Sequence, residues 1–85
     1  MSTNISIIIP TYNSEKFIFE CISNISNQIN EKIELIIIND CSTDNTEKIC
    51  NKFVRKNSYI KLINLKKNSG VSIARNIGIK KSKGK

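Results

Sequence analysis

Three short apolar runs alternate with segments of helical spacing, and this alternation constrains the fold more than any other feature. The runs occupy residues 5–9, 33–38 and 60–65. The first two are nearly unbroken and rich in β-branched residues, which is typical of strands buried on both faces of a parallel sheet. The third alternates between apolar and polar residues, which predicts an edge strand.

The segments that follow the runs predict three helices, because their apolar residues recur at steps of three and four. The expected apolar positions are Phe17, Ile18, Cys21, Ile22, Ile25 and Ile29, then Ile49, Cys50, Phe53 and Val54, and finally Val71, Ile73, Ala74, Ile77 and Gly78. Asn13 or Ser14 is expected to cap the first helix. Asp44, with Glu47 three residues later, is expected to cap the second. Ser69-Gly70 is expected to lead into the third.

The order β-α-β-α-β-α predicts an α/β fold, a Rossmann-like open parallel sheet with right-handed crossovers. Its strand order should be 3-2-1. The chain has 85 residues, so one small domain is the upper limit. Ligands of such sheets bind beyond the carboxyl ends of the strands, and the residues that follow each strand are therefore the candidates for function.

Charge is divided unevenly along the chain. Residues 1–47 contain all seven acidic residues and only two lysines, whereas residues 48–85 contain the other twelve basic residues and no acid. A basic half of this kind can attract phosphates, nucleic acid or an anionic membrane surface, or it can be a solvated face. RNA binding would require aromatic residues interleaved with the basic ones, and this half offers only Phe53 and Tyr59.

The three cysteines, Cys21, Cys41 and Cys50, have no Cys-x-x-Cys spacing, and the chain has no histidine. This argues against a disulfide framework or a zinc site and favours a reducing, cytoplasmic compartment. The N-terminal residues lack the pattern of a signal peptide, and no apolar stretch is long enough to span a bilayer. Any membrane association would therefore be peripheral.

Residues 10–13, Pro-Thr-Tyr-Asn, follow the first strand. Pro10 ends the strand because it has no N–H for the ladder. Thr11 and Asn13 offer hydrogen-bonding groups, and Tyr12 offers a ring on which a base can stack. The alternative is a turn and a helix cap with Tyr12 on the surface.

Two further loops carry candidate binding groups. Asp40 follows the second strand, where a carboxylate can accept from a base N–H or a ribose hydroxyl, although turn formation is the alternative. Gly70 permits a positive φ or the close approach of a ligand. Arg75 can pair with a diphosphate or lie in solvent. No Gly-x-Gly-x-x-Gly or Walker-type loop follows any strand, which argues against a dinucleotide enzyme and a P-loop NTPase.

Taken together, three ordered motifs resemble those of family 2 glycosyltransferases, which have the GT-A fold. The motifs are residues 7–13 (IIIPTYN), 36–46 (IIINDCSTDNT) and 68–78 (NSGVSIARNIG). Asn39 stands where the family often has an acid, and Cys41 stands where glycine is common. A φ > 0 backbone at Cys41 would be mildly strained.

The resemblance implies a donor site for a nucleotide-sugar, usually UDP-linked. Thr11 and Tyr12 would lie around the base, and Asp40 would hydrogen-bond to it. Arg75 would lie near the base and diphosphate, with Gly70 at the loop's close approach. The acceptor would be a glycan, a lipid or a protein, and nucleic acid would not be a partner.

The family's Asp-x-Asp strand, which holds a divalent cation (Mg²⁺ or Mn²⁺), and its catalytic base have no counterpart here. Residues 1–85 are therefore expected to be the N-terminal, nucleotide-binding portion of a single glycosyltransferase domain, truncated before that strand. No catalytic and no metal-binding residue is assigned, and the 85 residues alone should be inactive. We expect the enzyme in the cytoplasm, either free or at the inner face of the membrane. The alternatives are a nucleotide- or RNA-binding module without catalysis, or an inert gene fragment.

Overall fold

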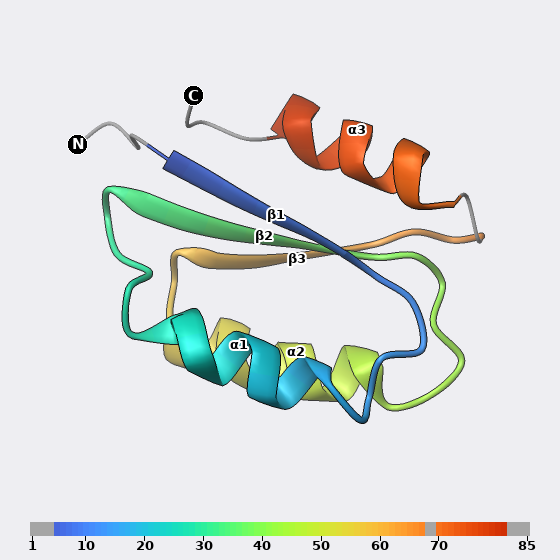
Figure 1. Ribbon diagram of the computed structural model, residues 1–85, viewed down its shortest axis with the longest axis horizontal. Helices are drawn as coiled ribbons and strands as arrows, with labels where there is room; N and C mark the ends of the chain where they lie inside the picture. Colours follow the sequence, from blue (N-terminus) through green and yellow to red (C-terminus); the bar gives the residue numbers. More distant parts are fainter. Residues whose placement is uncertain (1–4, 68–69, 82–85) are drawn as a thin grey trace.

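The computed structural model of the chain describes residues 5–67 and 70–81. Three strands and three helices alternate along the chain, as the sequence predicts (Figure 1). The elements are β1 (Ile5–Thr11), α1 (Ile18–Ser26), β2 (Ile33–Asn39), α2 (Thr46–Lys56), β3 (Ile60–Asn64) and α3 (Val71–Lys81). None of the described helices is long and apolar enough to cross a membrane.

The strands form one parallel sheet in the order β1-β2-β3, which confirms the predicted 3-2-1 arrangement. Both pairings run in continuous register, with Ile5 opposite Ile33 and Thr11 opposite Asn39. Asn39 is in turn opposite Asn64 on β3. The carboxyl ends of all three strands are therefore aligned at one edge of the sheet.

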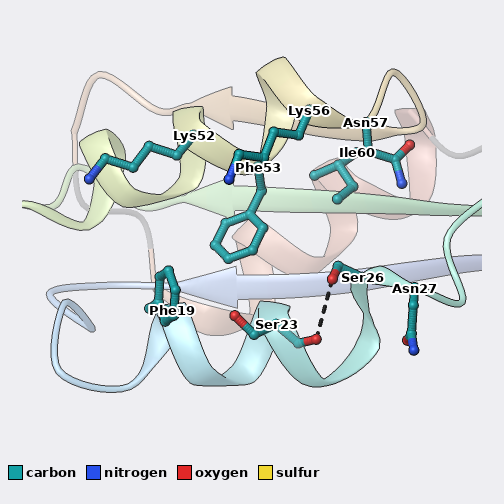
Figure 2. Close-up of a pocket in the computed structure, with 9 residues that line it drawn as sticks. All are labelled: Phe19, Ser23, Ser26, Asn27, Lys52, Phe53, Lys56, Asn57 and Ile60. Atoms are coloured by element: carbon teal, nitrogen blue, oxygen red, sulfur yellow. Dashed lines mark hydrogen bonds between the residues drawn. The ribbon is translucent and has the colours of Figure 1, made fainter.

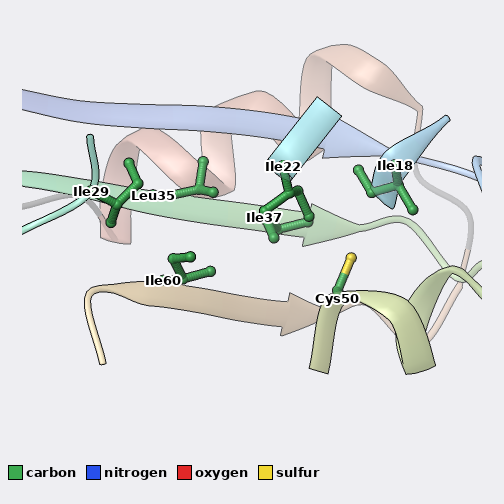
Figure 3. Close-up of a cluster of buried hydrophobic side chains, with 7 residues drawn as sticks. All are labelled: Ile18, Ile22, Ile29, Leu35, Ile37, Cys50 and Ile60. Carbon is green, nitrogen blue, oxygen red and sulfur yellow. The ribbon is translucent and has the colours of Figure 1, made fainter. Parts of the chain in front are cut away.

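Helices α1 and α2 cover one face of the sheet, and α3 covers the other (Figure 1). Leu35 and Ile37 of β2 belong to the core cluster beneath α1 and α2, whereas Ile36 and Ile38 belong to the cluster beneath α3. This alternation follows from the two-residue period of a strand. The buried members of the first cluster are Ile18, Ile22, Ile29, Leu35, Ile37, Cys50 and Ile60 (Figure 3).

Of the three described strands, only the central strand, β2, is buried on both faces. The sequence predicts the same double burial for β1. Residues 34–39 of β2 are all buried, but Ile5 is 49% exposed and residues 6–10 of β1 are half-buried. The reason is that β1 pairs with a strand on one side only within the described residues, so its outer edge is open. The prediction of double burial was correct for β2 and wrong for β1.

The start of α1 differs from the prediction. Neither Asn13 nor Ser14 caps the helix through its side chain, because α1 begins at Ile18, after a turn in which the Ser14 carbonyl accepts from the Phe17 and Ile18 amides. Phe17, expected on the apolar stripe, is 72% exposed. Cys21 is also exposed, whereas Cys50 of α2 is buried as expected. Burial raises the pKa of the Cys50 thiol to about 11, with a smaller contribution from the Glu47 carboxylate.

Helix α3 approaches the sheet closely through small residues. Ala74 and Gly78 are buried, and Ile77 packs against the cluster beneath the helix. Ile73, expected on this face, is 54% exposed. Ser69, expected at the entry to the helix, lies outside the described residues.

On the sheet face that α3 covers, a buried acidic side chain links the three strands near their amino ends. Glu34 is 2% exposed; its carboxylate accepts a hydrogen bond from the Ser6 hydroxyl and pairs with the Lys61 ammonium at 3.3 Å. A buried carboxylate is tolerated only where it is paired in this way. The apolar pattern of the strands does not predict this network.

The close fit of α3 yields a prediction for Gly78→Ala. A Cβ atom at residue 78 would lie 2.4 Å from Cγ2 of Ile8, a β-branched side chain with little freedom to move. Overpacking of this kind costs about 1–3 kcal/mol, against a helix-propensity gain of about 1 kcal/mol. We expect a net loss of about 1 kcal/mol in the free energy of unfolding, measured by urea denaturation.

A double-mutant cycle with Ile8→Ala checks the cause. Removing the clashing methyl group should abolish the cost, so Gly78→Ala should no longer destabilise in the Ile8→Ala background. Ser72→Ala, at an exposed position of α3, is the control. Stabilisation by Gly78→Ala without coupling to residue 8 would show that helix propensity alone governs the position.

Candidate functional site

A small pocket lies at the carboxyl end of the sheet, where ligands of open parallel sheets bind. It has a volume of about 40 Å³ and is lined by Pro10, Thr11, Tyr12, Asp40 and Ala74. The pocket therefore joins the end of β1, the residue after β2 and the first turns of α3. A volume of this size holds a water molecule but not a nucleobase.

Thr11 supplies an unsatisfied polar group to this pocket. The residue is 5% exposed, and its hydroxyl oxygen is buried with no hydrogen-bond partner among the described residues. Its backbone carbonyl accepts from the Asp40 amide at 2.8 Å, which extends the β1–β2 pairing by one step. A buried hydroxyl without a partner costs about 1–3 kcal/mol, so this position favours a water molecule or a ligand that completes the bond.

Asp40 joins two of the loops. It is 4% exposed, and its Oδ2 accepts from the Gly70 amide at 2.8 Å. Gly70 has φ +87°, and a Cβ atom there would meet nothing within 4 Å. The glycine is therefore favoured by its backbone conformation and not by crowding against the protein, whereas the close approach of a ligand at Gly70 stays a prediction.

The remaining two predicted residues lie at the surface. Tyr12 is 48% exposed at the rim of the pocket. Arg75 is exposed on α3 directly after Ala74, and within residues 5–67 and 70–81 its guanidinium makes no hydrogen bond or ion pair. The structure therefore brings Thr11, Tyr12, Asp40 and Gly70 together and leaves Arg75 outside their hydrogen bonds.

A network between the first two loops, which sequence reasoning missed, supports this edge. Asn13 has φ 48°, its amide donates to Ser42 Oγ at 2.9 Å, and its Oδ1 accepts from the Thr43 amide at 2.7 Å. The Ser14 amide donates to Thr46 Oγ1 at 2.9 Å. The only sequence signal was the tolerance of asparagine for a positive φ, which is equally compatible with the helix cap that was predicted.

Asp44 connects the same two loops to the start of α2. Its Oδ1 accepts from the Thr46 amide at 2.9 Å and its Oδ2 from the Glu15 amide at 3.2 Å. The first of these bonds lies at the helix start, but α2 begins at Thr46 with Asn45 as its N-cap, so the predicted capping box of Asp44 and Glu47 is wrong. The second bond ties the helix start to the β1–α1 loop. Burial by itself would raise the pKa of Asp44, but the hydrogen bonds from Thr46 and Glu15 outweigh it and lower that pKa.

The two departures from the resembled motif are accommodated locally. Asn39 is 2% exposed, and its amide donates to Asn64 Oδ1 at 2.9 Å, while its own Oδ1 accepts from the Ser42 amide at 3.3 Å. An amide can donate and accept at once, which an ionised acid cannot do. Cys41 has φ 59°, as its place in a glycine position suggested, so the loop keeps the left-handed turn.

The described residues do not fit a divalent cation. No group of three or more histidine, cysteine or acidic side chains within them could hold a metal ion. The pocket lining includes one carboxylate, that of Asp40, and this carboxylate is bonded to the Gly70 amide.

The model of a protein family described as glycosyl transferase family 2 matches residues 6–85. Similar proteins include the glycosyltransferase GlyG of Streptococcus pneumoniae serotype 4, 36% identical over 84 residues that make up 99% of this chain and 28% of GlyG. The minor teichoic acid biosynthesis protein GgaA of Bacillus subtilis is 47% identical over 79 residues, 87% of this chain and 17% of GgaA. The chain thus spans less than a third of the length of these relatives.

Solved structures show the same arrangement of strands and helices. Residues 1–349 of S. aureus TarS in complex with UDP-GlcNAc superimpose with a TM-score of 0.88 at 36% identity, over 96% of this chain and 24% of that one. The mannosyltransferase PcManGT of Pyrobaculum calidifontis, in complex with GDP-Man and Mn²⁺, superimposes with a TM-score of 0.82 over 96% of this chain and 25% of that one. At 22% identity, PcManGT is evidence for the fold alone.

The lowered pKa of Asp44 predicts an acid-sensitive link between the loops. A carboxylate with a folded-state pKa below its ordinary value of 3.8 stabilises the fold fully above about pH 3.8. That contribution is lost as the pH falls from there through the folded pKa. Asp44→Asn should lower stability at neutral pH and reduce the decline in the free energy of unfolding below pH 4, measured by urea denaturation from pH 6 to pH 2.5.

Glu31→Gln removes an exposed acid at the opposite edge of the sheet and is the control. It should leave the decline below pH 4 close to that of the unmodified chain. If Asp44→Asn and Glu31→Gln gave the same pH profile, the Asp44 bonds would contribute nothing to the fold.

Proposed function

Because this chain belongs to glycosyl transferase family 2 and has the GT-A arrangement of strands and helices, we propose that its carboxyl-end pocket binds the nucleotide of a nucleotide-sugar donor. UDP is the proposed nucleotide, as UDP-GlcNAc is bound in the similar TarS structure. Thr11, Tyr12, Asp40, Gly70 and Arg75 form the proposed site.

The observation that carries this proposal is the unsatisfied Thr11 hydroxyl beside the buried carboxylate of Asp40. A hydroxyl can donate or accept, and a carboxylate, which has about four acceptor positions, can accept from several donors at once, as Asp40 does from the Gly70 amide. A base that offers both an N–H donor and a carbonyl acceptor matches this pair of groups. Uracil offers both on one edge.

The exposed groups extend the site beyond the pocket. Since the pocket holds about 40 Å³, a base would lie over its mouth with an edge toward Thr11 and Asp40. The Tyr12 ring stands at this rim, where it can stack on the base. The exposed guanidinium of Arg75 can reach into solvent toward a diphosphate.

We propose that the complete protein transfers the sugar to a glycan, lipid or protein acceptor, and that residues 1–85 supply its nucleotide-binding portion. This is supported by the glycosyltransferase names of the relatives and by their greater length. A divalent cation and the catalytic base would come from parts of a longer domain, because the acids described here do not form a metal site. The free cysteines support a cytoplasmic location.

Thr11→Val tests the site most sharply, because valine has nearly the shape of threonine and lacks the hydroxyl. Removing a buried hydroxyl that has no hydrogen-bond partner among the described residues should leave the free energy of unfolding unchanged or higher. If the hydroxyl bonds to the ligand, the affinity for UDP should fall about five- to tenfold. NMR titration of the labelled chain with UDP measures affinity, and urea denaturation measures stability.

Asp40→Ala should weaken UDP binding at least about tenfold, since it removes a charged hydrogen-bond acceptor. Glu31→Ala removes an exposed acid at the opposite edge and should leave affinity within about twofold. The proposal fails if UDP produces no saturable shifts around residues 11, 40 and 70, or if Asp40→Ala binds as tightly as the unmodified chain.

A further inference from the structure

A second and much larger pocket lies between α1 and α2 (Figure 2). These two helices cover the sheet face opposite α3 (Figure 1). Its volume is about 380 Å³, within the range of roughly 300–1,000 Å³ typical of small-molecule sites. It reaches Ile60, the first residue of β3, and therefore the amino end of the sheet. None of its lining residues belongs to the proposed donor site.

Two aromatic rings line this pocket, one from each helix. Phe19 of α1 and Phe53 of α2 have their ring centroids 5.5 Å apart at an interplanar angle of 51°. Figure 2 shows the Phe53 ring reaching from α2 toward α1, where the Phe19 ring stands. Phe19 is 57% exposed although its neighbour Ile18 is buried in the core. The exposed Phe19 ring and the half-buried Phe53 ring therefore offer an apolar platform between the two helices.

The α2 rim of the pocket is basic. Lys52 and Lys56 line it, and Lys48 lies one further turn back, so three exposed lysines follow one another at four-residue steps. Like charges at this spacing destabilise a helix. Within the described parts of the chain, neither Lys52 nor Lys56 has an ion-pair or hydrogen-bond partner, and the pocket lining contains no acid. A bound anion would relieve this repulsion.

The α1 rim is polar but uncharged. Ser23 and Asn27 lie one turn apart on it, and a hydroxyl and an amide both donate and accept hydrogen bonds. Asn57, at the end of α2, is already used by the fold, because its amide donates to the Ile29 carbonyl and its Oδ1 accepts from the Tyr59 amide. The two rims therefore differ: one is cationic and the other suits hydroxyl groups.

We propose that this α1–α2 groove binds a segment of an acidic glycan, a sugar chain that carries carboxylate or phosphate groups. The C–H face of a sugar ring would pack on Phe19 and Phe53. Its hydroxyls would bond to the α1 rim, and its anionic group would pair with Lys52 and Lys56. The two aromatic rings favour this occupant over an acidic peptide. A peptide could satisfy the lysines and bond to the opposite rim through its backbone, but Asp and Glu side chains have no broad apolar face to cover the rings. A membrane surface would require a protruding apolar face rather than a groove between helices.

Titration of the labelled chain with three probes tests the inference. Tetragalacturonate carries both sugar and charge, its fully methyl-esterified form keeps the sugar without the charge, and tetraglutamate keeps the charge without the sugar. We expect saturable NMR shifts at residues 19, 23, 27, 52 and 56 with tetragalacturonate. Binding of the other two probes should be at least about tenfold weaker, since each lacks one set of contacts.

Charge-matched variants separate the groove from general attraction to a basic protein. The double variant Lys52→Gln/Lys56→Gln should weaken tetragalacturonate binding at least about tenfold. Lys80→Gln/Lys81→Gln removes the same charge from exposed positions of α3, on the other sheet face, and should change it less than about twofold. Phe19→Ala, at an exposed position, should weaken it about fivefold. Circular dichroism checks that each variant is folded.

Equal losses in the two lysine variants would overturn the proposal in favour of non-specific attraction. Tetraglutamate binding as tight as that of tetragalacturonate would overturn it in favour of an acidic peptide, and the absence of saturable shifts would refute the site altogether. The outcome is independent of the proposed donor site, because Asp40→Ala should leave tetragalacturonate binding unchanged while it weakens UDP binding.

Discussion

The burial of β2 on both faces is the constraint from which the rest of the structure follows. Leu35 and Ile37 pack beneath α1 and α2, and Ile36 and Ile38 pack beneath α3. Each fully buried side chain of this size contributes roughly 1.5–3 kcal/mol. Because β1 and β3 pair in register with this strand, all three strands end at one edge. The position of the candidate site is therefore a consequence of how the sheet is buried.

The loops at that edge are held by polar bonds rather than by apolar packing. Asn13 and Asp44 join the first two loops, and Asp40 joins the second loop to Gly70. Positive φ values at Asn13, Cys41 and Gly70 let the chain turn sharply enough for these bonds to form. Among the described residues, the Thr11 hydroxyl is the one buried side-chain group without a hydrogen-bond partner, and departures of this kind are expected at functional sites.

The acidic and basic halves of the sequence form two different surfaces of the folded protein. The acids Asp40 and Asp44 lie in the loop that follows β2, where they accept hydrogen bonds from backbone amides. The lysines of α2 instead line a groove that reaches the amino end of the sheet. The two candidate sites share no residue, so a nucleotide and an acidic glycan could be bound at the same time.

The sequence by itself determined the order of strands and helices, the strand order of the sheet and the nearness of Thr11 to Asp40, because periodicity and the rules of parallel sheets are enough for these. It also indicated the positive φ at Gly70 and Cys41. Only the tertiary structure decided that Asn13 braces a loop instead of capping α1, that Phe17 faces solvent, and that Gly78 fits against Ile8. It also decided that Phe19 meets Phe53 above an open groove. These features depend on contacts between segments far apart in the chain, whose distances are set when the helices pack on the sheet, and no local pattern of residues carries that information.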